Sequence, residues 1–169
     1  MTAPIEFEVS MKFFAFTKTG IVRIIAVSLM LSVYISTIIM NYASREITSG
    51  NFFATIIFIA VFVAFYIFSA LKKHPPLFFG AKGWLIASFV MSFAALLASS
   101  ADFEIGGFIG TVLGYGVLLF VSPFFGFVWL FGDFEWIGVI GMLLCVLIFF
   151  IPPIAEKIAH RRKLMREFK

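Results

Sequence analysis

Long apolar runs alternate with short polar segments over most of the chain. Three of these runs are residues 24–41, 52–71 and 84–101. At about 1.5 Å per residue, each is long enough to cross a hydrocarbon core of about 30 Å as a helix. The consecutive prolines Pro75 and Pro76 end the helix of the second run, and Trp84 is predicted at the membrane interface where the third begins.

The remaining apolar stretch, residues 105–151, allows two interpretations. Ser122 and Pro123 interrupt it once, and the polar segment 132–136 interrupts it again. By length, the two halves give a fourth and a fifth span. Alternatively, residues 105–131 enter the membrane, turn near Pro123 and return, so that only residues 137–151 complete a crossing.

The distribution of basic residues distinguishes these interpretations. Lys and Arg near span ends concentrate on the cytoplasmic side of a membrane. Five spans divide the 13 Lys and Arg almost evenly between the two sides, whereas four spans and a hairpin leave Arg45 alone outside. We therefore expect four spans, a re-entrant hairpin and two cytoplasmic termini, with five spans as the alternative.

The fold class predicted is an all-α polytopic integral membrane protein. Its parts are an N-terminal arm (residues 1–20), a helical membrane domain (21–154) and a basic cytoplasmic tail (155–169). Within the arm, apolar and polar residues alternate over positions 5–13, which is typical of a strand; an irregular interfacial arm is the alternative.

The tail is predicted to be an amphipathic helix that lies on anionic lipid headgroups. Its expected headgroup-binding residues are Lys157, Arg161, Arg162, Lys163 and Arg166. Each basic residue close to an anionic membrane contributes about 1 kcal/mol of binding. We favour lipid over an acidic protein or RNA as the partner of the tail, because the flanks of membrane spans are commonly basic, and we expect no nucleic-acid binding.

Composition supports a membrane location. The chain is 62% apolar and 13% charged, against about 25% charged in a soluble domain. So little polar surface cannot cover a protein in water, so apolar side chains must face lipid. We expect a bacterial inner membrane, because the chain is compact and its sequence has no Asn-x-Ser/Thr motif.

Small residues recur every fourth position in several runs. On a helix this spacing forms a ridge that another helix can approach closely. The expected interface residues are Gly106, Gly110, Gly114, Ser28, Ser32, Ser36, Ser88 and Ser92. Packing within one bundle is the first interpretation of these ridges and a seam between copies is the second.

Residues suited to catalysis or metal binding are sparse. Four carboxylates are predicted on the outer face and can provide oxygen ligands for a cation: Asp102, Glu104, Asp133 and Glu135. Solvated span ends are the simpler interpretation. His74, His160 and the single cysteine, Cys145, are far apart in sequence. We expect no enzyme activity, cofactor or metal.

Three functions remain as hypotheses. The first is a non-catalytic protein that binds another membrane protein through its helix faces and its glycine-rich hairpin, as an immunity or exclusion protein or as an accessory subunit of a complex. The second is an oligomeric channel or facilitator for a small solute or ion. The third is a membrane-embedded lipid-modifying enzyme that uses the outer carboxylates.

Overall fold

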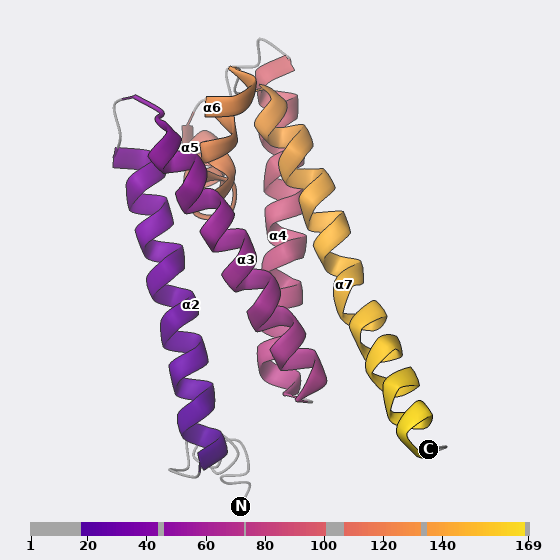
Figure 1. Cartoon of the computed structure of the whole chain (residues 1–169). Coiled ribbons are helices and arrows are strands. Elements are labelled where there is room, and N and C mark those ends of the chain that lie inside the picture. Colours follow the sequence, from indigo (N-terminus) through magenta and orange to yellow (C-terminus); the bar gives the residue numbers. More distant parts are fainter. Residues whose placement is uncertain (1–17, 44–45, 73, 101–106, 133–134, 168–169) are drawn as a thin grey trace, which may run out of the picture.

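Four long helices form the frame of the protein. A computed structural model describes residues 18–43, 46–72, 74–100, 107–132 and 135–167 (Figure 1). The long helices are α2 (Lys18–Ala43), α3 (Ser49–Leu71), α4 (Pro75–Ser100) and α7 (Glu135–Glu167). All four contain a segment long and apolar enough to cross a membrane. The described part of the chain is therefore all-helical and has the character of a multi-pass membrane protein, as the sequence predicts.

Three short elements separate α4 from α7. They are α5 (Gly107–Phe120), the 3-10 helix η1 (Ser122–Phe127) and α6 (Val128–Phe131). The axis bends by 63° between Gly110–Phe120 and Ser122–Phe131. Figure 1 shows these elements beside the end of the bundle where α3 begins, and α2 begins and α7 ends at the opposite end.

Helix α4 begins earlier than the expected third span. It starts at Pro75, whereas the sequence pattern placed the start at Trp84. Proline is well tolerated in the first turn of a helix, because the amide hydrogen that it lacks has no partner there. Consequently Lys82, which precedes the expected span, and Trp84, which begins it, both lie inside α4.

Helix α7 continues beyond the expected end of the last span. It runs through Pro152 and Pro153 to Glu167, so the tail continues α7 and is not a separate helix. A proline removes one hydrogen bond from a helix interior, but membrane helices tolerate this loss. The predicted strand at positions 5–13 lies outside the described residues.

An aromatic cluster fills the centre of the bundle. The ring centroid of Trp84 lies 4.7 Å from that of Phe62, 5.4 Å from that of Phe58 and 6.2 Å from that of Phe124. Phe58, Phe62 and Phe124 are buried. Trp84 therefore joins α3 and α4 to η1 through ring contacts.

Small residues allow α4 and α7 to pack closely at one end. A Cβ at Gly138 would lie 2.9 Å from the carbonyl oxygen of Ser92, and one at Gly141 would lie 2.7 Å from Ser92 Oγ. Both separations are below ordinary van der Waals contact, so the two glycines are required for this approach. Figure 1 shows α4 and α7 diverging toward the C-terminal end of α7.

Candidate functional site

The bend between α5 and η1 exposes backbone groups that no regular helix satisfies. Pro123 occupies the first turn of η1 and has no amide hydrogen to donate. A polar backbone group that is buried without a partner is costly, most of all in lipid. The hydrogen-bond partners of the backbone carbonyl groups at the bend therefore decide whether the bend is stable.

Side chains of α2 and α3 supply those partners. Asn41 Nδ2 donates to the carbonyl oxygen of Ser122 at 2.8 Å, and Thr55 Oγ1 donates to that of Pro123 at 2.8 Å. Thr55 Oγ1 also accepts from the amide of Gly126 at 3.2 Å and from Asn41 Nδ2 at 3.2 Å. One asparagine and one threonine thus satisfy both sides of the turn.

Tyr34 extends this network along α5. Its hydroxyl donates to the carbonyl oxygen of Leu119, just before the bend. The Tyr34 ring also packs edge-on against Trp84, with the ring centroids 6.0 Å apart. The α5–η1 bend is therefore anchored at its turn and one residue before the end of α5, in both cases by polar side chains from α2.

Asn51 joins the ends of α2 and α3 and lies against η1. Its Nδ2 donates to the carbonyl oxygen of Met40 at 2.8 Å, and its Oδ1 accepts from the Thr48 amide at 2.9 Å. A Cβ at Gly126 would collide with the Asn51 carbonyl oxygen and with Thr55 Oγ1. Gly126 is thus the position at which η1 touches the α3 backbone.

Two atoms of this cluster have no hydrogen-bond partner among the described residues. They are Asn41 Oδ1 and Ser122 Oγ, and both residues are buried. Ser88 Oγ and Ser92 Oγ in α4 share this condition. The interior of the bundle therefore contains side-chain oxygen atoms that can form more hydrogen bonds than the described residues supply.

The predicted interface residues divide into inward-facing and outward-facing groups. Ser88 and Ser92 are fully buried, and Ser92 lies against the α7 glycines. The exposed members are Ser28, Ser32, Ser36 and Gly114. Gly110 is half-buried, and Gly106 lies outside the described residues.

A groove lies on the outer face of α5 around Gly114. The residues that line it are Tyr42, Thr111, Gly114, Tyr115, Val117, Leu118 and Phe125, around a volume of about 410 Å³. A Cβ at Gly114 would meet nothing within 4 Å, and Tyr42 and Tyr115 are 67% and 65% exposed. We call this surface the α5 groove. Gly114 is left uncovered, because Gly116 is the glycine that faces α4, against Met91.

Tyr34, Asn41, Thr55 and Gly126 are not among the residues predicted from the sequence. A signal for two of them was present, since Asn41 and Thr55 are polar residues within apolar runs. Such residues in membrane helices usually hydrogen-bond to a neighbouring helix. Their partners in η1 are 81 and 68 residues away in sequence, so no local pattern identifies them.

Most of the remaining candidates are outside the described residues. Asp102, Glu104 and Asp133 fall outside the described residues, as does the side chain of Glu135 at the start of α7. No group of three His, Cys, Asp or Glu side chains that could hold a metal occurs among the residues that the structure describes. Lys157 and Arg161 are exposed on α7, while the side chains of Arg162, Lys163 and Arg166 are outside the described part.

A polar contact also forms at the opposite end of the bundle. Arg23 Nε of α2 donates to His74 Nε2, which precedes α4, at 3.4 Å. Desolvation lowers the pKa of His74 below its ordinary value of 6.5, and the positive charges of Arg23 and Lys72 lower it further. This pair connects α2 to the turn between α3 and α4.

Comparisons with known proteins give no family for this chain. No family model, no curated protein and no solved structure matches it.

Proposed function

We propose that this chain is a non-catalytic inner-membrane protein that acts by binding a transmembrane helix of another membrane protein in the α5 groove. The observation that carries the proposal is the open position of Gly114, which has free space where a side chain would stand. In lipid, helices associate through close packing of small residues. A glycine that its own bundle leaves uncovered is therefore suited to close approach by a helix from outside.

The residues around Gly114 support a protein partner. Tyr42 and Tyr115 flank the glycine and are largely exposed. Tyrosine contributes a large contact area with little loss of conformational freedom and can also form a hydrogen bond. The Thr111 hydroxyl lines the same groove. Together these groups suit the apolar face of a helix that carries an occasional polar residue.

The proposal includes a re-entrant hairpin formed by α5, η1 and α6. Tyr34 is nine residues before the end of α2, and at about 1.5 Å per residue it lies roughly 14 Å from that end. Its bond to Leu119 supports a segment that enters the bundle to about this depth, while the turn itself bonds to Asn41, two residues before the end of α2. The side chains of Asn41 and Thr55 supply the shielding that a turn within the membrane requires.

The proposed orientation of the protein in the membrane follows from the distribution of its basic residues. Four spans and a hairpin place both termini in the cytoplasm and leave Arg45 as the sole outer Lys or Arg among 13. The α5 groove then opens toward the outer half of the membrane. Topology reporters fused after residue 132 and after residue 169 should report opposite sides, and a periplasmic C-terminus would contradict this orientation.

Photo-crosslinking in native membranes tests the partner. A photoreactive residue at Tyr115 should form an adduct with a different integral membrane protein. Gly114→Leu fills the groove and should abolish the adduct. Gly83→Leu is the matched control, because Gly83 is also exposed with open space around it, and it should preserve the adduct.

Two outcomes would contradict the proposal. An adduct that survives Gly114→Leu would remove the groove from the binding site. Adducts only between copies of this chain, together with ion or solute flux from the purified protein in liposomes, would replace the proposal with the oligomeric channel. An immunity protein, an exclusion protein and an accessory subunit differ in the identity of the captured partner, which mass spectrometry of the adduct provides.

A further inference from the structure

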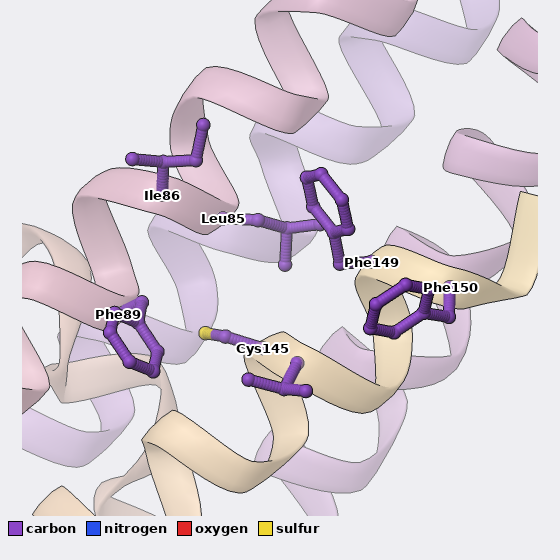
Figure 2. Close-up of a pocket in the computed structure, with 7 residues that line it drawn as sticks. Leu85, Ile86, Phe89, Cys145, Phe149 and Phe150 are labelled. Carbon is purple, nitrogen blue, oxygen red and sulfur yellow. The ribbon is translucent and has the colours of Figure 1, made fainter.

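A second groove lies between α4 and α7, on a surface separate from the α5 groove. Leu85, Ile86 and Phe89 of α4 and Cys145, Val146, Phe149 and Phe150 of α7 line it, around a volume of about 200 Å³ (Figure 2). We call it the α4–α7 groove. Figure 2 shows the Cys145 side chain directed from α7 toward Phe89.

The groove arises where the two helices separate. Gly138 and Gly141 hold α7 against Ser92 of α4. Further toward the start of α4, the large side chains of Phe89 and Phe149 stand between the helices. The floor of the groove is closed by Leu85 and Cys145, which are buried.

The walls of the groove are apolar and face the membrane. Ile86, Val146 and Phe150 are 55%, 44% and 57% exposed, and their exposed surfaces lie on helices apolar enough to cross a membrane. In a bilayer such a surface contacts acyl chains. A groove of about 200 Å³ accommodates a segment of one chain and not a whole lipid.

Lys82 places a positive charge beside this groove. Its Nζ lies 5.1 Å from the ring centroid of Phe149, which lines the groove, and 4.7 Å from that of Phe78. Phe78 is one turn nearer to the start of α4, so the ammonium group is directed toward that end of the helix. Long basic side chains adopt this arrangement to bring their charge near lipid headgroups.

The environment of Lys82 favours an anionic ligand. Lys82 lies within the apolar segment Pro75–Leu97 of α4, and a charge in such a segment is costly without a counter-charge. No carboxylate pairs with it among the residues that the structure describes, where its recorded partners are the two aromatic rings. Phe78 is three residues into α4, about 4.5 Å along the axis, which is within reach of headgroup phosphates.

From this geometry we infer that the α4–α7 groove binds one anionic phospholipid. The headgroup phosphate pairs with the Lys82 ammonium, and one acyl chain fills the groove along Ile86, Val146 and Phe150. The site differs from the basic tail in its mode of recognition. The tail offers charge alone, whereas this groove joins one charge to a shaped apolar surface.

Native mass spectrometry of the full-length protein in detergent tests the inference. Phosphatidylglycerol and phosphatidylcholine with the same acyl chains are titrated against the wild type, Lys82→Gln, Lys82→Arg and Lys72→Gln. Removal of one lysine charge near a headgroup weakens binding about fivefold. We therefore expect Lys82→Gln to reduce phosphatidylglycerol retention about fivefold and to reduce phosphatidylcholine retention less, because the choline charge offsets that of its phosphate.

The other variants separate the site from general charge attraction. Lys82→Arg keeps the charge and should retain phosphatidylglycerol. Lys72 is an exposed lysine near the same end of α4, and Lys72→Gln should have no effect. Ile86→Trp fills the groove from an exposed position, and should reduce the retention of both lipids.

Three results would overturn the inference. They are equal retention of the two lipids by the wild type, equal losses in Lys82→Gln and Lys72→Gln, and full retention in Ile86→Trp. Inorganic phosphate has no acyl chain and should not compete for the site. Competition by phosphate at the same concentration as the lipid would show that Lys82 binds free phosphate instead. Circular dichroism of each variant excludes misfolding as the cause of a loss.

Discussion

Asn41 of α2 donates a hydrogen bond of 2.8 Å to the carbonyl oxygen of Ser122, 81 residues further along the chain. Both residues are buried. This bond connects the end of a long helix to the bend between α5 and η1. It shows how a break in a helix is stabilised by a side chain from a neighbouring helix.

Replacement of Asn41 by Ala should therefore destabilise the protein. The change leaves the Ser122 carbonyl group without its donor and removes one partner of Thr55. A buried polar group that loses its partner costs about 1–3 kcal/mol. Unfolding in mixed micelles should show a loss in this range. Ser32→Ala, on an exposed face of the same helix, should have no effect, and an equal loss in both variants would contradict the assignment.

Gly126→Ala tests the contact between η1 and α3. The added methyl group would collide with the Asn51 carbonyl oxygen and with Thr55 Oγ1. The collision with backbone cannot be relieved by a side-chain rotation, so a loss of about 1–3 kcal/mol is expected. Gly114→Ala is the matched control, because open space surrounds that position. Unchanged stability in Gly126→Ala would show that η1 moves away from α3 at little cost.

The sequence establishes the long helices and leaves their faces undetermined. Four apolar runs predict the four helices that are long and apolar enough to span a membrane. The small-residue ridges did not indicate which side packs, and Ser92 is buried while Ser32 is exposed. In water, an apolar stripe marks the buried side of a helix. In lipid the packed side and the lipid-facing side of a helix are both apolar. Periodicity therefore identifies a small-residue face but does not show what packs against it.

Helix ends and long-range polar contacts were less accessible to prediction. The start of α4 at Pro75 agrees with the local tolerance of proline in the first turn of a helix, whereas the continuation of α7 through Pro152 departs from the local rule against proline in a helix interior. The bond between Thr55 and Pro123 spans 68 residues. Its two partners can be recognised as unusual in the sequence, but only the fold brings them together.

Removal of either of two buried hydroxyl groups should change the stability of the protein in opposite directions. Thr55 Oγ1 forms hydrogen bonds with Pro123, Gly126 and Asn41. Thr55→Val should therefore lower the free energy of unfolding by about 1–3 kcal/mol. Ser88 Oγ is buried without a partner among the described residues, so Ser88→Ala should be neutral or stabilising by up to about 1 kcal/mol. Unfolding of the two variants in the same micelles provides the comparison. A clear destabilisation by Ser88→Ala would reveal a partner for that hydroxyl.

The contact between Arg23 and His74 should weaken as the pH falls. Desolvation, followed by the charges of Arg23 and Lys72, lowers the pKa of His74 below 6.5. A base whose pKa is lowered on folding binds protons more readily when its contact is broken. Protonation of His74 therefore destabilises the folded protein as the pH falls through about 6.5. It has no effect at pH 8.

Thermal unfolding in detergent at pH 8 and pH 5 measures this effect. The wild type should unfold at a lower temperature at pH 5, and His74→Gln should reduce the difference between the two pH values, because glutamine does not titrate. His160→Gln is the control, since His160 is exposed near the end of α7, and it should behave as the wild type. A pH dependence that is unchanged in His74→Gln would place the titrating group elsewhere, and would leave the Arg23 contact as a bond that pH does not regulate.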